Sequence, residues 1–467
     1  MGSYDATDPT DFTAAQLVRA YRDGRLSPVE VARAFIARSE RLDERVNAWR
    51  MLDVDGALEM ARRSEERYRE LSPLGRLDGV PVAIKDDLAV KGWTARHGSR
   101  ATSDAPDATD APTVAGFRRH GAVFLGRTTM PEVGWKAVTD SPLTGITRNP
   151  WDTERTPGGS SGGNAAVLAL RLAPLAVGSD IGGSVRIPAA FCSVVGFKST
   201  QGRVPLDPRT KTGMLLQAGP MARTVEDATV ANEVATEWAA TAPAPPGTEA
   251  PDALAGNVRG LRVALAPGFN GARPERPIAA AIAAVAEVLA EQGAHVEEVA
   301  PDLGPDPRSL YERLYGPMLA AEIAGLPAEK HDLLDPGFRE AAAPWRESPA
   351  VDFVAAMYER RGLIQALHVF HGKYDLLLTP TVPISPFAVG RETPSGRAGE
   401  RWYDWTPCTW PVNLTGQPAI SIPCGFTPEG LPIGAQLIGA RHADSVVLRA
   451  AHVYQRARPD ILRRPET

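Results

Sequence analysis

Cysteine is scarce in this sequence, and its scarcity limits the structural chemistry of the chain. The 467 residues include three cysteines, Cys192, Cys408 and Cys424, and no two of them form a CxxC pair. An odd and scattered count argues against a disulfide framework and against a zinc site. Cys192 and Cys424 lie among apolar residues, so we expect them to be small buried side chains.

Long apolar runs and basic blocks are also missing. No uninterrupted apolar stretch is long enough to cross a bilayer, so no membrane partner is expected. The first residues, MGSYDATDPTDF, lack the apolar core of a secretory signal, which predicts a cytoplasmic location. The formal net charge is -5, and no basic cluster stands out. Nucleic acid is therefore not an expected partner.

The motifs of several common enzyme classes are absent as well. The sequence has no HExxH zinc motif, no phosphate-binding GxxxxGK[ST] loop and no SxxK tetrad. Its eight histidines are scattered, and none lies in a glycine-rich or acidic cluster. We therefore expect neither a metal nor another cofactor.

What the chain does contain is an alternation of short apolar strands with amphipathic helices. Pro28 is expected to begin a helix with Ser27 as its N-cap. We predict strands at 79–84, 122–125, 175–177, 261–266, 296–299, 374–378, 419–422 and 433–438, and helices at 278–289 and 443–456. Strands interleaved with helices indicate an α/β fold whose sheet is covered on both faces.

A glycine-rich turn holds the first candidate for chemistry. Ser184 lies in GSDIGGSVRIP, directly after the strand predicted at 175–177. Glycines let the backbone turn tightly, and successive N–H groups in such a turn bind an anion. The pattern is also typical of an ordinary tight turn, so the motif alone leaves both interpretations open.

A second glycine-rich run, GGSSGG, contains Ser160 and Ser161. It leads straight into an apolar helical segment, which argues against a flexible linker. The run also fits the GxSxG motif of α/β-hydrolases, but that motif needs a strand directly before the serine. The preceding residues are polar and broken by proline, so we reject this assignment.

Lys85 ends the apolar stretch VPVAI. It is either an ordinary lysine at a strand edge or a functional amine, because a desolvated lysine has a lowered pKa and acts as a base near neutral pH. Asp86 and Asp87 follow it, and we expect them to form a turn or a cap rather than a carboxylate pair.

In combination, these motifs resemble the amidase signature family. The serine motifs of that family read TPGGSSGGNAA and GSDIGGSVRIPAA here, and its lysine motif reads GVPVAIKD. Flanking segments such as TRNPWD, GPMARTVEDA and NLTGQPAISIPCGF are similar to it too, so the resemblance covers nearly the whole chain. It implies one large α/β domain with a central twisted mixed sheet and helices on both faces.

The resemblance also implies roles for individual residues. Ser184 matches the nucleophile, Ser160 the bridging serine that follows a cis peptide bond, and Lys85 the base. The expected activity is hydrolysis of a small linear carboxylic amide, at a carbon–nitrogen bond other than a peptide bond, through an acyl-enzyme. The other implied positions are the oxyanion-hole N–H groups of Ile181, Gly182, Gly183 and Ser184, and the bracing side chains of Ser161, Asp180 and Arg186.

Two other functions stay open. The A subunits of the tRNA-dependent amidotransferases are similar in length and carry an aspartate that handles the amine of glutamine. The corresponding position here is Thr406, two residues from Asp404, which disfavours that alternative. The other is a biosynthetic enzyme that transfers the acyl group to an amine. Whether the chain forms a homodimer or has other protein partners is also open.

The segment RWYDWTPCTWP is unusually aromatic. Trp405 and Trp410, together with Trp135, are candidates for a pocket wall that favours aryl or bulky acyl groups. Packing in the core is the alternative.

Length alone would suit about three domains, but the resemblance favours one. We divide the single domain, 1–467, into an N-terminal helical segment that packs on the body (1–70), the signature core (71–230), a loop rich in proline and alanine (240–256) and a C-terminal part (257–467).

Overall fold

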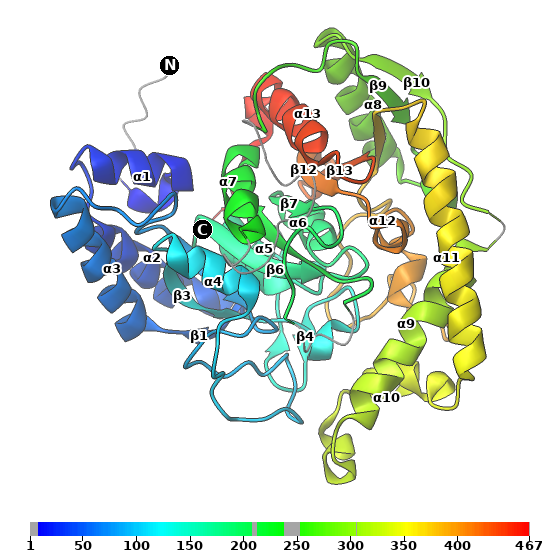
Figure 1. Cartoon of the computed structure of the whole chain (residues 1–467), viewed down its shortest axis with the longest axis horizontal. Helices are drawn as coiled ribbons and strands as arrows, with labels where there is room; N and C mark the ends of the chain where they lie inside the picture. The colour runs from blue at the N-terminus through cyan, green and yellow to red at the C-terminus, as the bar shows by residue number, and fades with distance from the viewer. Residues whose placement is uncertain (1–7, 208–212, 238–252, 305, 467) are drawn as a thin grey trace.

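The computed structural model describes residues 8–207, 213–237, 253–304 and 306–466, and one mixed sheet runs through them (Figure 1). In the order in which they pair, its eleven strands are β1 (Trp49–Leu52), β3 (Val123–Thr128), β2 (Pro81–Lys85), β6 (Leu175–Asp180), β8 (Gln217–Ala222), β7 (Val195–Lys198), β12 (Ala419–Phe426), β13 (Pro432–Gly439), β11 (Leu376–Pro380), β9 (Arg262–Leu265) and β10 (His295–Glu298). Two short strands, β4 (Asp140–Ser141) and β5 (Gly145–Ile146), pair separately.

The directions of the strands place the site. β2 runs parallel to both of its neighbours, β3 and β6, with Ile84 in register with Val177. The carboxyl ends of β2 and β6 therefore lie side by side at one edge of the sheet. In open α/β sheets this edge is where ligands bind. β9 is likewise parallel to β10 and β11, and the remaining pairs are antiparallel.

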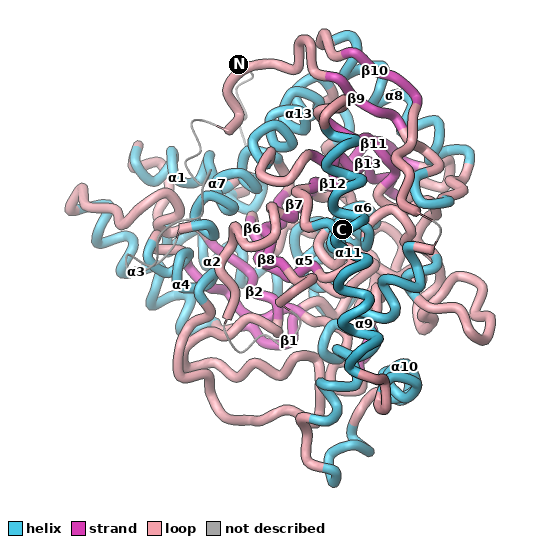
Figure 2. Tube along the Cα trace, turned by 45° about the vertical axis from the view of Figure 1, so that its right-hand side comes forward, coloured by secondary structure: helices cyan, strands magenta, loops and turns pink. Residues whose placement is uncertain are grey.

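Alternate residues of the central strands enter two different apolar clusters. Val82 and Ile84 belong to one cluster and Ala83 to the other, because successive side chains of a strand point to opposite faces. The first face is covered by α4 (Pro112–Arg119), α7 (Val225–Thr236), α8 (Arg276–Glu291) and α13 (Asp444–Ala457), and the second by α2 (Pro28–Leu42), α3 (Val54–Arg69), α5 (Gly162–Ala169) and α6 (Arg186–Cys192). The predicted α/β sheet with helices on both faces is confirmed, and Figure 2 shows its strands running through the middle of the molecule.

A further group of helices packs beside the sheet and forms an apolar cluster of its own. Figure 1 shows the long helices of this group along one side of the molecule. Its members are α9 (Pro307–Ala324), α10 (Pro336–Ala342), α11 (Ala350–His371) and α12 (Trp410–Thr415).

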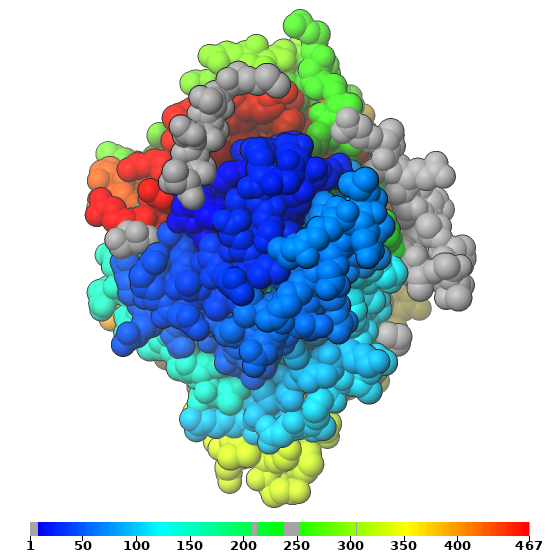
Figure 3. All heavy atoms as spheres, turned by 90° about the vertical axis from the view of Figure 1, so that its left-hand side faces the viewer, coloured from blue at the N-terminus to red at the C-terminus, as the bar shows by residue number. Residues whose placement is uncertain are grey.

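The N-terminal segment contains a strand that we did not predict. β1 extends the sheet antiparallel to β3, so residues 1–70 are not purely helical. α1 (Ala14–Arg22) begins at a capping box made by Thr13 and Gln16, and the N–H groups of its first two residues donate to the Asp227 carboxylate of α7. Figure 3 shows this segment spread across one face of the molecule.

The other predicted elements are present, with boundaries that differ by a few residues. β7 and β8 are strands that the sequence analysis did not propose. Most of the loop predicted at 240–256 lies outside the described residues, and within its described end, 253–256, there is no helix or strand.

Candidate active site

Lys85 is the last residue of β2, and its amine is fully buried. The strand reads PVAIK and lies between β3 and β6, so the apolar residues before the lysine carry it into the interior. Its Nζ donates a hydrogen bond to the Ser160 Oγ at 2.8 Å and another to the Ser179 Oγ at 2.9 Å. The Asp87 carboxylate lies 3.4 Å from the same nitrogen.

Burial lowers the pKa of the Lys85 amine, because a charged ammonium loses its hydration in the interior. The carboxylates of Asp87 and Asp180 oppose this effect, but the net direction is downward. The neutral amine, which is able to accept a proton, is favoured relative to a lysine in water.

Ser160 follows a cis peptide bond from Gly159, as the resemblance implied. Its hydroxyl lies against Gly134, where an added Cβ would come within 3.2 Å of the Ser160 Oγ and where φ is +72°. Glycine meets both requirements at that position. The next residue, Ser161, donates its N–H to the Ser184 carbonyl at 3.1 Å and so joins the two serine loops.

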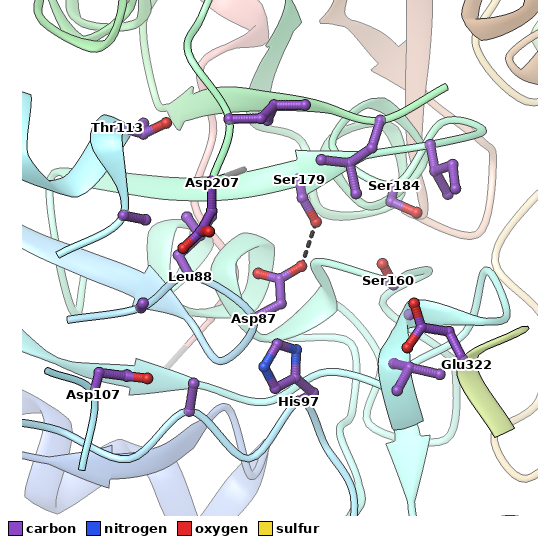
Figure 4. A pocket seen from close by; sticks show the side chains of 18 of the residues that line it. Asp87, Leu88, His97, Asp107, Thr113, Ser160, Ser179, Ser184, Asp207 and Glu322 are labelled. Carbon is purple, nitrogen blue, oxygen red and sulfur yellow. Dashed lines mark hydrogen bonds between the residues drawn. The ribbon is translucent and has the colours of Figure 1, made fainter. Parts of the chain in front are cut away.

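Ser184 lies in the turn between β6 and α6, and its side chain lines the same cavity as Ser160 and Ser179 (Figure 4). The cavity has a volume of about 330 Å³. Among the hydrogen bonds of the described residues, none joins the hydroxyls of Ser160 and Ser184. The hydrogen bond between Lys85 and Ser160 is therefore present in the structure. Ser184 lines the same cavity but makes no direct hydrogen bond to Ser160.

The turn before Ser184 differs in one respect from the expected oxyanion hole. The Gly183 N–H donates to the Asp180 carboxylate at 2.8 Å, so this group is already engaged. The N–H groups of Ile181, Gly182 and Ser184 have no acceptor among the described residues. Three of the four predicted donors are thus available to an anion, and the fourth braces the turn.

A buried polar network holds this turn in place. Arg186 donates to both carboxylate oxygens of Asp180, at 2.9 and 3.0 Å, and to the Asn413 Oδ1 and the Gln436 Oε1, both at 2.6 Å. Burial alone would raise the pKa of Asp180, but the Arg186 guanidinium holds it well below its usual range. Thr409 adds a bond from its hydroxyl to the Gly182 carbonyl at 2.7 Å.

Sequence reasoning named Asp180 and Arg186 but missed several of their partners. Asn413 comes from NLTGQPAISIPCGF, a segment already noted as similar to the family, and that similarity was the available signal. Gln436 lies on β13. Asp87 was expected to serve in a turn or a cap, and Ser179 was given no role. The structure places both against the Lys85 amine.

The three tryptophans proposed for a pocket wall do not line the cavity. Trp405 stacks on Phe191 with ring centroids 5.9 Å apart, and all three indoles belong to the apolar cluster around α9 to α12. Packing in this cluster removes the large apolar indole rings from water. The same rings would stay partly in contact with water if they lined the cavity. The cavity wall includes Tyr315, Leu319 and Ile181 instead.

Within the described part of the chain, no three histidine, cysteine, aspartate or glutamate side chains are arranged to hold a metal ion. Across the same residues, no helix combines the length and apolar character needed to cross a membrane. Cys192, Cys408 and Cys424 are free and buried, which confirms the expectation for Cys192 and Cys424.

The arrangement is suited to acyl transfer. A neutral amine bonded to a serine hydroxyl is able to relay a proton, and a second serine beside unengaged N–H groups is placed to attack a carbonyl. Among the described hydrogen bonds, no histidine contacts either hydroxyl, and the amine that contacts Ser160 is that of Lys85.

Comparison with known proteins shows the family. The sequence profile named Amidase matches residues 30–448. The chain is 33% identical to the glutamyl-tRNA(Gln) amidotransferase A subunit from Roseiflexus castenholzii, over 97% of each chain. It is 34% identical to the protein of the same name from Chloroflexus aggregans, over 95% of this chain and 96% of the other.

Solved structures agree in fold. A bacterial aryl acylamidase of the amidase signature family superposes with a TM-score of 0.87 at 30% identity, over 97% of this chain and 98% of the other. A 6-aminohexanoate cyclic dimer hydrolase superposes with a TM-score of 0.87 at 29% identity, over 98% and 99%. This protein belongs to the amidase signature family.

Proposed function

We propose that this protein is an amidase that hydrolyses a small carboxylic amide to an acid and ammonia or an amine. Ser184 is the nucleophile, Ser160 the proton bridge and Lys85 the base. The observation that carries the proposal is the 2.8 Å bond from the buried Lys85 amine to Ser160, on the cavity that Ser184 lines.

Acylation begins with proton transfer. Neutral Lys85 takes a proton from the Ser160 hydroxyl as Ser160 takes one from Ser184, so the Ser184 oxygen attacks the amide carbonyl. The resulting oxyanion accepts hydrogen bonds from the N–H groups of Ile181, Gly182 and Ser184. Each such donor is worth about 3 to 4 kcal/mol in related sites.

The leaving group then departs as a neutral amine. Ser160 passes a proton to the amide nitrogen and recovers one from the Lys85 ammonium, because expulsion of an amide anion is prohibitively slow. The carbon–nitrogen bond breaks and leaves an ester on Ser184. Water attacks this ester, gives its proton to the same relay and releases the acid.

A second candidate is the role of an amidotransferase A subunit, which the names of the relatives from Roseiflexus and Chloroflexus favour. The structure supports the free-standing amidase instead. The Asp404 carboxylate binds Arg308 and the Arg401 N–H, and the Thr406 hydroxyl donates to the Trp402 carbonyl. The segment 401–411 therefore contributes no carboxylate to the cavity.

Labelling with a fluorophosphonate probe tests the proposed nucleophile. We expect mass spectrometry to find one adduct on Ser184, and no adduct in the Ser184→Ala variant. Lys85→Ala should slow labelling by a factor of about 10² to 10⁴ while the circular dichroism spectrum stays unchanged. Labelling of Lys85→Ala at the wild-type rate would refute the proposed relay.

Product analysis separates the functions. A free-standing amidase releases acid from primary amides and anilides when it is the sole protein present. A protein that works only with partners would leave these amides intact and hydrolyse glutamine only in their presence. A product formed with an added amine in place of water would instead identify an acyltransferase.

A further inference from the structure

Asp87 lies beside the proposed base. It follows Lys85 by two residues, in the turn that ends β2. Its carboxylate accepts a hydrogen bond from the Ser179 hydroxyl, which Figure 4 shows, and Ser179 in turn accepts one from the Lys85 Nζ at 2.9 Å. A short chain of polar groups therefore leads from the carboxylate through a hydroxyl to the amine.

The surroundings of Asp87 differ from those of its acidic neighbours. Asp86 is paired with Arg50, and Asp180 with Arg186. Asp87 is paired with the Lys85 amine, 3.4 Å away, and its second carboxylate oxygen is buried without a hydrogen-bond partner in the described structure. The Lys85 amine is thus the cation with which the Asp87 carboxylate is paired.

We propose that Asp87 is a positioning residue for the general base. Through the Ser179 hydroxyl it orients the Lys85 amine toward Ser160, and its charge sets the pH above which that amine is free of its proton. This inference rests on the proposed function, because it assigns Asp87 a role only if Lys85 is the base.

Two opposing electrostatic effects act on the Lys85 amine. Burial favours the neutral amine, and a carboxylate at 3.4 Å favours the ammonium. Asp180 also acts on Lys85, but the Arg186 guanidinium compensates its charge. The other titratable side chains that line the cavity are His97, Asp107, Asp207, Tyr315 and Glu322. Among all of these, Asp87 is the acid in contact with the amine.

Asp87→Asn removes the charge and keeps the size of the side chain. The ammonium then loses its counter-ion, so the amine gives up its proton at a lower pH. The rate of Ser184 labelling, which needs the neutral amine, should rise at a lower pH than in the wild type. We expect the midpoint of its pH profile to fall by about 1 to 3 pH units.

The experiment measures the rate constant for labelling of Ser184 by a small fluorophosphonate, followed by intact-protein mass spectrometry, from about pH 5 to about pH 10. Asp110→Asn is the matched control, since Asp110 is paired with Arg118 and its side chain does not line the cavity. Its midpoint should stay at the wild-type value. A midpoint of Asp87→Asn that is unchanged, or that moves upward, would overturn the inference.

Ser179 offers a second and independent pair of variants. Ser179→Ala breaks the hydroxyl bridge and keeps both charges, so labelling should slow even at high pH. Ser179→Thr keeps the hydroxyl and should restore the rate. Equal rates for the two variants would also overturn the inference, and this result does not depend on the folding of Asp87→Asn.

Different results would contradict the proposed function and the proposed role of Asp87. If the wild type is not labelled at Ser184, or Lys85→Ala is labelled as fast as the wild type, the proposed function is wrong. If Lys85→Ala is slow but Asp87→Asn keeps the wild-type midpoint, the function stands and the role of Asp87 is wrong.

Discussion

Removing Arg186 from its buried ion pair with Asp180 should strongly destabilise the protein, and Arg186→Met tests this. Both side chains are fully buried, and the guanidinium makes two bonds to the carboxylate at 2.9 and 3.0 Å. Methionine fills much of the same volume but leaves the carboxylate without its counter-ion. Breaking a buried pair in this way costs about 3 to 5 kcal/mol of unfolding free energy.

The effect should depend on pH with a definite sign. In the wild type the pKa of Asp180 is held well below its unfolded value of about 3.9, so the contribution of this group is fully present above that pH and is lost as the pH falls through the folded pKa. In Arg186→Met, burial raises the pKa of Asp180 instead. Protonation then relieves the unpaired charge, and the deficit of the variant should shrink as the pH is lowered from about 7.5 to about 5.

Urea unfolding followed by tryptophan fluorescence measures these differences at both pH values. The double variant Arg186→Met/Asp180→Asn, which removes the charge as well, should recover part of the loss. Arg262→Met is the control, because its ion pair with Asp375 is half exposed and should contribute little. An Arg186→Met protein within about 1 kcal/mol of the wild type at neutral pH, or a double variant no more stable than the single one, would refute the reasoning.

Two further predictions concern packing. Gly182→Ala would place a Cβ 2.4 Å from the Trp402 ring, so calorimetry should show a loss of about 1 to 3 kcal/mol together with slower labelling of Ser184. Gly362→Ala, with open space at its Cβ, should leave labelling unchanged. The three cysteines are buried with raised pKa values, so a thiol reagent should modify none in the native protein and all after unfolding; prompt modification of the native protein would contradict this placement.

Much of the fold was predictable because local signals agreed with the tertiary structure. The strand that ends at Lys85 is a short apolar run, and the helix predicted at 278–289 shows clear periodicity; both are present. β8 was missed because its sequence, QAGPMA, lacks a strand-like pattern and its pairing depends on the strands on either side. β1 was missed because it lies between two helices that dominate the N-terminal pattern.

The candidate site was predictable as a set of residues but not as a set of contacts. Lys85 and Ser160 are 75 positions apart, and the bond between them depends on the packing of α5, which begins just after Ser160, against β2. The sequence also does not show on which side of a segment a side chain lies. For this reason its pattern suggests a pocket wall at Trp405, which packs in the core, and only a turn at Asp87, which contacts the proposed base.

The order of strands in the sheet has a consequence for how the protein is made. β7 follows the Ser184 loop by a few residues and pairs with β12, which comes much later in the sequence. Arg186 likewise binds Gln436 on β13. During synthesis, the edge of β7 waits unpaired while more than two hundred later residues are translated. The serine loops acquire their full support only after β12 and β13 have been translated. A product that stops before Asn413 therefore carries both serines but lacks the Asn413 and Gln436 side chains that bind Arg186, and we expect it to be inactive.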